Sequence, residues 1–433
     1  MPSRQEQRLA PVDEANLVLD HAGQTNVFLV AGVLVPEEGG FLGHGEADLD
    51  LLRTVIAERI VELPQLRCVP VGHGRRHRWR DATPDLDHHV RSIARVDGPA
   101  GFERVCGELM TVPLPRDRPL WELLLVPGAS PRGVGLILRI HHAIADGMAA
   151  VGIIQRLFDH AGPVGPDPPP PPLTGGRERP DGRARIGYGL ERVRMTLFGR
   201  EVGETVLLGE RSPHRSVRFL STDLGMLEAR SRDAGATIND ALLAAVSSGY
   251  RKALSRAGES IPDRLPVSVP VALPRRGTVA NRVGVMLVRL PLGEADPDVR
   301  LRLIAAQTRS EKERARGQGT LELMRGPAGA RMMDHLAHRQ HLVAGFVTNV
   351  PGPPGTLRLA GAPIAALWPV AVLAANVRLG VAAVSYDQRL CCGVHFDADT
   401  VPGDDFARAM AEEFRRLTGG ADLSPAASDR PAR

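Results

Sequence analysis

Aromatic residues, lysine and cysteine are scarce in this sequence, and each scarcity excludes something. Aromatic side chains make up 4% of the 433 residues, so the cores must be built mainly from leucine, valine, alanine and isoleucine. Lysine occurs only at Lys252 and Lys312, and arginine supplies the rest of the 54 basic side chains. The four cysteines form no CxxC pair, and adjacent Cys391 and Cys392 should point to opposite faces of a strand. We therefore expect reduced thiols, without a disulfide framework or a cysteine-based metal site.

An excess of one charge and a long apolar run are also missing. The formal net charge is +4, and the sequence lacks the basic stripe with interleaved aromatics of a nucleic-acid-binding protein. The first residues have no apolar run typical of a signal peptide. The most apolar window, 365–383, is interrupted by Pro369, Asn376 and Arg378. We expect a cytoplasmic protein with no nucleic-acid partner, whose contact with the inner membrane or lipid inclusions is at most peripheral.

Proline and glycine are concentrated in one segment, residues 162–185. This segment has almost no apolar periodicity and predicts a semi-rigid exposed linker. It divides the chain into an N-terminal domain, 1–161, and a C-terminal domain, 186–418, both of ordinary domain size. Residues 419–433 are predicted to form a disordered tail.

Strand-like and helix-like segments alternate in both halves. Apolar runs predict strands at 27–35, 121–126, 133–140, 267–273, 282–292, 344–349, 379–385 and 389–396. Helical spacing predicts helices at 47–63, 101–114 and 237–256, and another after residue 147. This mixture predicts an α/β fold (an α+β sandwich) with a cleft between the halves as the default site.

The densest polar cluster at the end of a buried strand is HHAIADG, from His141 to Gly147. A histidine at a strand end is held by the sheet yet exposed at its rim, where a neutral imidazole can act as a general base. Gly147 leaves room for a substrate. Alternatively, Asp146 is only the N-cap of the next helix, and one of the two adjacent histidines is structural.

The HHxxxDG pattern resembles the signature of the acyl-CoA-dependent acyltransferase superfamily, which includes chloramphenicol acetyltransferase and peptide-synthetase condensation domains. Further blocks resemble the bacterial wax ester synthase/diacylglycerol acyltransferase family, in the family's order: LAPVDEANLVL near the start, PLW at 119–121, ND at 239–240, NRVGVMLVRLPL, and TNVPGP at 348–353. The resemblance implies two chloramphenicol-acetyltransferase-like domains, a tunnel at their interface, acyl-CoA as co-substrate, and no bound cofactor or metal.

The resemblance also implies roles for individual residues. His142 would be the base that lets an alcohol attack the acyl-CoA thioester directly, and His141 would support it. Asp146 would hold the loop through an ion pair instead of relaying a proton. The product would be triacylglycerol or a wax ester, made from diacylglycerol or a long-chain alcohol.

Other candidate site residues each have a structural alternative. Asn239 and Asp240 are candidates for substrate binding and oxyanion stabilisation, but residues 237–240 also form a capping-box-like helix start. The segment Pro119-Leu120-Trp121 lines the acyl or alcohol path, or else begins a strand and packs in the core. Thr348 and Asn349 are candidates for binding the pantetheine arm of the co-substrate acyl-CoA, whereas the turn alone explains the glycine and prolines that follow.

The sequence supports neither a metal site nor a serine-hydrolase mechanism. His335, His338 and His341 are spaced by three, which spreads them around a helix and argues against a compact metal site. No GxSxG elbow, the mark of a serine hydrolase, is present.

Three alternative functions remain open: an acyltransferase that modifies a polyketide, sugar or other secondary metabolite, a carrier-protein-dependent condensation enzyme, and a non-catalytic lipid-binding protein. The low aromatic content and the sequence ALPRRG after Val271 both favour a narrower or different acyl or alcohol pocket.

Overall fold

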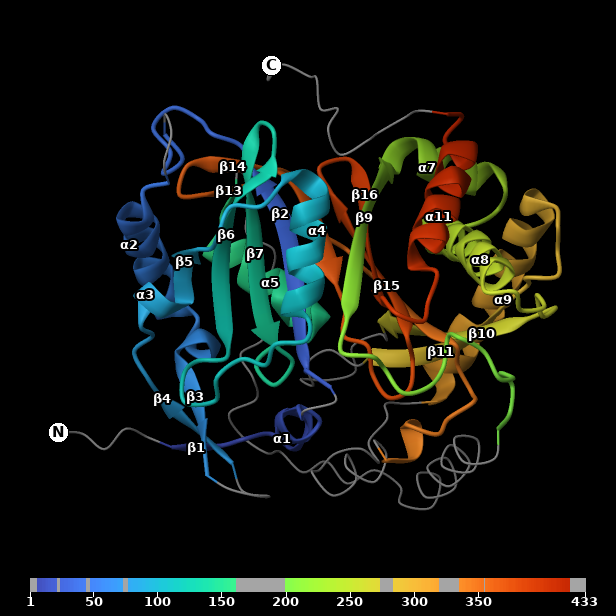
Figure 1. Cartoon of the computed structure of the whole chain (residues 1–433), viewed down its shortest axis with the longest axis horizontal. Coiled ribbons are helices and arrows are strands. Elements are labelled where there is room, and N and C mark those ends of the chain that lie inside the picture. The colour runs from blue at the N-terminus through green and yellow to red at the C-terminus, as the bar shows by residue number, and fades with distance from the viewer. Residues whose placement is uncertain are drawn as a thin grey trace.

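The computed structural model describes residues 6–21, 24–43, 47–72, 77–160, 199–272, 283–318, 335–353 and 355–420. The predicted linker at 162–185 and all but the first two residues of the predicted tail lie outside these ranges. In the described part the chain forms two large sheets side by side, with helices on their outer faces (Figure 1). This confirms the mixed α/β fold.

The first sheet has seven strands and carries the HHAIADG segment. Its order is β5 (Val90–Ser92), β6 (Trp121–Ser130), β7 (Gly133–His141), β2 (Val27–Leu34), β14 (Ala362–Val370), β13 (Leu357–Leu359) and β8 (Asp159–His160). All neighbours are antiparallel except β5 and β6. Helix α4 (Gly98–Leu109) lies on one face and α5 (Gly147–Leu157) on the other (Figure 1).

The second sheet has six strands, all from the C-terminal half. Its order is β11 (Val283–Leu290), β10 (Leu265–Ala272), β12 (Gly345–Val350), β15 (Leu379–Tyr386), β16 (Arg389–Asp397) and β9 (Arg215–Asp223). Strand β12 runs parallel to both of its neighbours. The helices beside this sheet are α7 (Leu224–Asp233), α8 (Ile238–Arg256), α9 (Pro297–Gln318) and α11 (Gly403–Leu417).

Smaller elements complete the N-terminal half. A three-stranded sheet has the order β1 (Gln7–Arg8), β4 (Arg78–Asp81), β3 (Cys68–Val71). The remaining helices are α1 (Pro11–Val18), α2 (Leu49–Arg59), α3 (Leu86–His89) and the short 3₁₀ turns η1 (Ile60–Glu62) and η2 (Pro64–Arg67). Helix α4 ends at Leu109, earlier than predicted, because the residue before Pro113 disfavours helical backbone angles.

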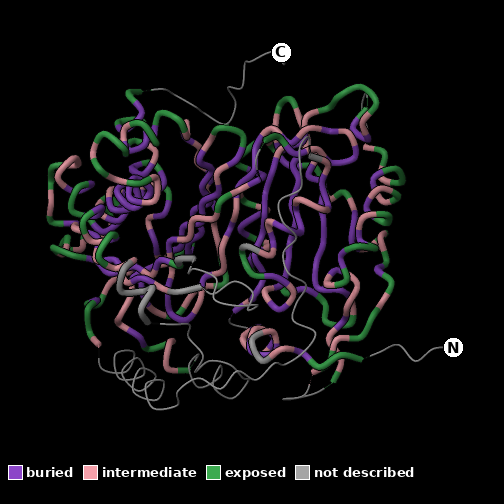
Figure 2. The backbone as a smooth tube through the Cα atoms, turned by 180° about the vertical axis from the view of Figure 1, so that it is seen from behind, coloured by how far each residue is buried: buried purple, intermediate pink, exposed green. Residues whose placement is uncertain are grey.

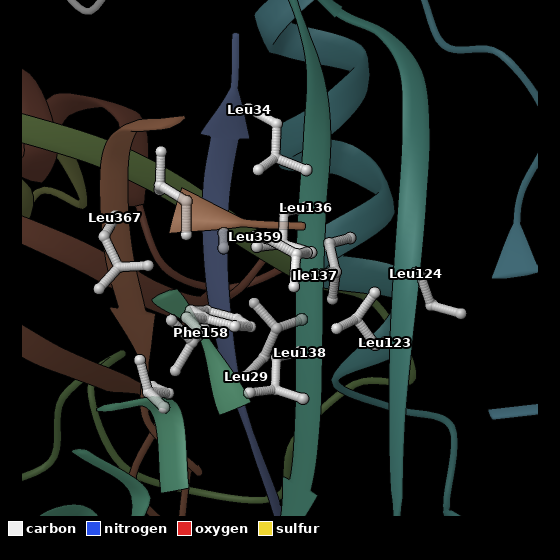
Figure 3. Close-up of a cluster of buried hydrophobic side chains, with 14 of the residues drawn as sticks. Leu29, Leu34, Leu123, Leu124, Leu136, Ile137, Leu138, Phe158, Leu359 and Leu367 are labelled. Carbon is white, nitrogen blue, oxygen red and sulfur yellow. The ribbon is translucent and has the colours of Figure 1, made fainter. Parts of the chain in front are cut away.

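Two apolar cores hold these layers together. The first lies around β2, β6 and β7 on both faces of the sheet, and Figure 3 shows buried leucines of these neighbouring strands beside one another. The second lies between the C-terminal sheet and its helices. Adjacent Cys391 and Cys392 belong to the first and second core respectively, which confirms that they point to opposite faces of β16. Figure 2 shows the strands buried and the exposed residues gathered on outer helices and loops.

One strand that follows residues 162–185 in the sequence belongs to the sheet of the N-terminal half. Strand β14 comes from the C-terminal half but pairs with β2, from Ile364 opposite Leu34 to Val370 opposite Leu29. Its Trp368 stacks on Phe219 of β9 at a ring separation of 4.9 Å. The first sheet is therefore complete only with a segment from the C-terminal half, while the domain boundaries themselves stay a prediction.

Candidate active site at the end of β7

The HHAIADG segment forms the turn between β7 and α5, as predicted. Asp146 is exposed and caps α5, since its Oδ1 accepts the Ala149 N–H at 2.8 Å. Gly147 follows at the first helical position, and a Cβ placed there would lie 3.5 Å from Val350 Cγ2. The turn thus meets the end of β12, a strand of the other sheet. No cationic side chain in the described ranges pairs with Asp146, so its structural role here is the helix cap.

His141 is fully buried, its Nδ1 is hydrogen-bonded, and its Nε2 faces a carboxylate. Its Nδ1 accepts the backbone N–H of Ala143 at 2.9 Å. A nitrogen that accepts a hydrogen bond carries a lone pair, so the ring proton of neutral His141 is on Nε2. That Nε2 lies 3.4 Å from Asp20 Oδ2. The prediction that one of the two histidines is structural fits this geometry.

His142 is half-buried and its main chain is fixed, whereas its ring is not. Its N–H donates to Asn26 O at 2.9 Å, and its carbonyl accepts the Asn16 side-chain amide at 3.1 Å. The ring meets Phe28 edge to face at 4.9 Å. Burial lowers the pKa of His142 to about 4. Its ring is therefore neutral at pH 7, and no group in the described ranges hydrogen-bonds to its nitrogens.

Asp20 is a site residue that the sequence did not reveal. It is buried, and its carboxylate receives the Asn26 N–H at 3.0 Å and Arg116 Nη2 at 3.3 Å, besides facing His141. Burial raises its pKa, but these donors outweigh burial and leave the pKa of Asp20 below its ordinary value. The carboxylate is thus ionised beside the turn. Its only local signal was its position just after the LAPVDEANLVL block.

A second carboxyl group, Asp13 of α1, lies close to the same turn. Burial raises the pKa of Asp13 to about 7, with the charge of Asp146 adding to the effect. A hydrogen bond from Trp79 of β4 acts in the opposite direction. Asp13 therefore lies within electrostatic reach of Asp146, beside the turn.

The Pro119-Leu120-Trp121 segment supports the turn and the core. The Leu120 carbonyl accepts the His141 N–H at 3.1 Å, and its side chain packs with Ala143 in a small apolar cluster. Trp121 is buried, donates from Nε1 to Leu66 O at 2.8 Å and stacks on His89. For Trp121 these contacts match the core-packing alternative, and a substrate contact by Pro119 or Leu120 stays a prediction.

The predicted pair at the start of α8 divides into a structural and a partly exposed residue. Asp240 is buried, and its carboxylate accepts the Thr237 N–H at 2.8 Å and the Thr308 hydroxyl at 2.6 Å. Thr237 and Asp240 form the capping box that the alternative interpretation predicted. Asn239 is half-buried, and within the described ranges no hydrogen bond involves its side chain. The described contacts of α8 lie in the C-terminal half and do not join this pair to His142.

Thr348 and Asn349 lie on β12, next to the strand end that meets Gly147. Both are half-buried and pair with Ala382 and Ala383 of β15. Gly352 follows where a Cβ would lie 1.9 Å from the Ser385 carbonyl oxygen, so the close approach of two backbones explains this glycine. The structure therefore brings the TNVPGP block towards the HHAIADG turn.

The three spaced histidines have separate neighbours. His341 lies beyond the helical turn that contains His335, and its Nδ1 lies 3.1 Å from the Val202 carbonyl oxygen. The His338 ring is 6.2 Å from that of His21. In the described ranges no three His, Cys, Asp or Glu side chains are grouped to hold a metal ion. The same ranges contain no helix that is both long and apolar enough to cross a membrane.

Comparisons with known proteins place this geometry in a family. The model of the wax ester synthase/diacylglycerol acyltransferase catalytic domain matches residues 9–199, and that of the family's C-terminal domain matches residues 279–418. A Mycobacterium tuberculosis protein, assigned by name to the diacylglycerol O-acyltransferases, is 32% identical over 423 residues. The match covers 86% of this chain and 89% of that protein.

Solved structures show the same fold. The wax ester synthase/diacylglycerol acyltransferase of Marinobacter aquaeolei superimposes with a TM-score of 0.69 at 19% identity, over 95% of this chain and all of that one. The starter condensation domain of rhizomide synthetase, solved with C8-CoA, gives a TM-score of 0.54 at 15% identity, over 96% and 95% of the two chains. The chain therefore belongs to the wax ester synthase/diacylglycerol acyltransferase family, and it is an acyltransferase of that acyl-CoA-dependent family.

Proposed function

We propose that this acyltransferase transfers a fatty acyl group from acyl-CoA to the hydroxyl of diacylglycerol or a long-chain alcohol, making triacylglycerol or a wax ester. The observation that carries the proposal is His142. It is a neutral, half-buried histidine with a fixed main chain at the strand end where the family motif lies, and no group in the described part of the chain hydrogen-bonds to its ring nitrogens. A base at neutral pH needs this protonation state.

In the proposed reaction His142 accepts the proton of the alcohol as its oxygen attacks the thioester carbonyl. The tetrahedral intermediate then collapses, the C–S bond breaks, and the proton returns from His142 to the CoA sulfur. The acyl group passes directly to the alcohol, without an acyl-enzyme. Atoms balance with acyl-CoA and alcohol as reactants and ester and CoA as products.

Other residues take supporting roles in the proposal. His141 orients the turn, Asp146 caps α5, and Gly147 keeps the approach open next to Val350. We assign Thr348 and Asn349, on the strand that ends at this turn, to the pantetheine arm. We assign Asn239, at the N-terminus of α8, to stabilising the oxyanion, because donors and helix dipoles favour developing negative charge.

We also propose that the protein works in the cytoplasm and meets its lipid substrates by peripheral contact with the inner membrane or with lipid inclusions. Long-chain alcohols and diacylglycerol partition into such phases. Flotation of the purified protein with liposomes containing diacylglycerol tests this contact. Recovery of all protein in the lipid-free fraction would contradict it.

An acceptor panel tests the proposed substrates. Purified protein is incubated with palmitoyl-CoA and, separately, hexadecanol, dipalmitoylglycerol and short polar alcohols, and both free CoA and extracted esters are quantified. The proposal predicts stoichiometric CoA and ester with the lipid alcohols. Ester formation with the polar alcohols alone would favour an enzyme that modifies secondary metabolites, and binding of palmitoyl-CoA without CoA release would favour a non-catalytic lipid-binding protein.

Intact-mass spectrometry tests the direct route. After incubation with palmitoyl-CoA and no alcohol, the protein mass should be unchanged. A palmitoyl adduct that disappears when the alcohol is added would replace direct transfer with an acyl-enzyme.

A further inference from the structure

The Asp20 carboxylate is linked to both histidines of the HHAIADG turn, to His141 directly and to His142 through Asn26. Two hydrogen bonds reach it, from the backbone N–H of Asn26 at 3.0 Å and from Arg116 Nη2 at 3.3 Å, and His141 Nε2 lies 3.4 Å from its Oδ2. Arg116 also donates to the carbonyl oxygens of Leu17 and Asp20, so the cation is anchored in the same loop. A buried carboxylate is stable only with such partners.

The first tie runs through the His141 ring. Because Nδ1 accepts the Ala143 N–H, a proton on Nδ1 would point at another proton and break that bond. The backbone therefore holds His141 in the tautomer with its proton on Nε2, facing Asp20. Asp20 in turn orients this proton and does not require a charged imidazolium.

The second tie runs through the backbone to His142. Asn26, whose N–H is bound to Asp20, accepts the His142 N–H with its carbonyl oxygen at 2.9 Å. The Asn26 side-chain amide donates to the Asn16 carbonyl oxygen at 2.9 Å, and the Asn16 amide donates to the His142 carbonyl oxygen at 3.1 Å. The N–H of His142 is thus bound to Asn26, which Asp20 holds, and its carbonyl oxygen is bound to Asn16, which Asn26 holds.

We propose that Asp20 is a positioning residue that sets the orientation of His142 through the His141 ring and through Asn26. This inference rests on the proposed role of His142 as the base. No group in the described ranges hydrogen-bonds to the ring nitrogens of His142. The orientation of the ring therefore depends on the main chain and on packing against Phe28. A shift of about 1 Å in such a base can lower turnover about 100-fold.

The decisive variant is Asp20→Asn, which keeps the size but replaces one acceptor oxygen by a donor. An amide facing Arg116 and the His141 Nε2–H cannot accept from all three donors, so one tie must break. We expect kcat with palmitoyl-CoA and an active alcohol to fall about 10- to 100-fold, with the KM for palmitoyl-CoA changed less than about twofold. ¹⁵N spectra of histidine-labelled protein should show the Nε2–H tautomer of His141 in both proteins, because Ala143 fixes it, with the His141 Nε2 resonance shifted in the variant.

Asp397→Asn is the matched control. Asp397 is also buried, pairs with Arg215 at 3.4 Å and accepts the Ser212 N–H, but it lies at the end of β16 away from the turn. It should lower the unfolding midpoint without changing kcat per folded molecule. If Asp20→Asn fails to fold, Arg116→Gln, at a half-exposed position, should give a smaller kcat loss in the same direction.

The outcomes separate this inference from the proposed function. Full kcat in folded Asp20→Asn, while His142→Ala is inactive, would overturn the positioning role and leave the base in place. Activity in His142→Ala would overturn both. A wild-type spectrum with His141 protonated on Nδ1 would also overturn the inference.

Discussion

A histidine that packing shields from water stays neutral well below its ordinary pKa, and half-buried His142 is such a residue. Its lowered pKa of about 4 means that the base needs no deprotonation across the physiological range. The same burial makes it a weaker base than free imidazole, so the fixed geometry of the turn must compensate.

The kcat/KM of the transfer should therefore be independent of pH between about pH 5.5 and 8, because the base is deprotonated throughout. The acid limb should be centred near pH 4, as far as the folded protein can be assayed. Initial rates at limiting palmitoyl-CoA in a series of buffers of constant ionic strength measure this profile. An acid limb with an apparent pKa of 6 to 7 would mean that the base is another group or that His142 is not buried.

The sequence predicted the catalytic turn but not its supports. HHAIADG could be placed at a strand end because the apolar run before it is continuous and Asp146 is a typical cap. Asp20 could not be found, because its contact with Arg116 joins residues 96 positions apart. Local periodicity holds no signal for such a contact.

At the scale of elements, substitutions of Asp146 can separate its role as the cap of α5 from a need for its negative charge. Asp146→Asn keeps an accepting side-chain oxygen and should leave stability and turnover near the wild-type values. Asp146→Ala loses the bond to Ala149 and should cost about 1 kcal/mol of unfolding free energy, measured with urea. An Asp146→Asn protein that is folded but inactive would show that the charge itself is needed.

Substitutions at the start of α8 can separate a residue that stabilises the fold, Asp240, from a candidate for oxyanion binding, Asn239. Asp240→Ala leaves the Thr237 and Thr308 donors unpaired and should cost about 2–3 kcal/mol of stability, with little change in kcat per folded molecule. Asn239→Ala should alter stability by less than about 0.5 kcal/mol and, if the amide contacts the oxyanion, lower kcat about 100-fold. Urea unfolding and steady-state rates of both variants decide this. An unchanged kcat in Asn239→Ala would remove this residue from the site.

Most strands and helices were predictable because each is an apolar run or an amphipathic repeat bounded by glycine, proline or a cap. The strand pairing was not. The window 365–383 reads only as apolar, and the structure divides it between β14 in the first sheet and β15 in the second. Which strand lies beside β2 depends on long-range packing, such as Trp368 on Phe219.

At the scale of the whole molecule, several buried groups tie stability to pH. Burial lowers the pKa of His89 and His142 to about 4 and that of His395 to about 3, so the folded chain binds fewer protons there than the unfolded chain below pH 6.5. Asp13 acts in the opposite sense, because its raised pKa of about 7 makes the folded chain hold one extra proton. Because three histidines oppose one aspartate, the folded chain binds fewer protons overall than the unfolded chain between about pH 5 and 6.5.

The unfolding free energy should therefore fall as pH is lowered, with a slope of about 1 kcal/mol per pH unit near pH 6.5 that steepens to about 2.5 kcal/mol per pH unit near pH 5. Asp13→Asn removes the opposing group and should make the slope steeper. Urea titrations at pH 5, 5.5, 6 and 7 measure both slopes. A stability that is constant or rises towards pH 5 would contradict the burial of these histidines.

The most direct test of the account is ester formation from palmitoyl-CoA by wild type, His142→Ala and His89→Gln. His89 is the matched control, a buried histidine with a lowered pKa that stacks on Trp121 in the core. We expect His142→Ala to be folded and at least about 100-fold slower, while His89→Gln keeps wild-type turnover per folded molecule. Equal turnover in wild type and His142→Ala would contradict the central claim that His142 is the base.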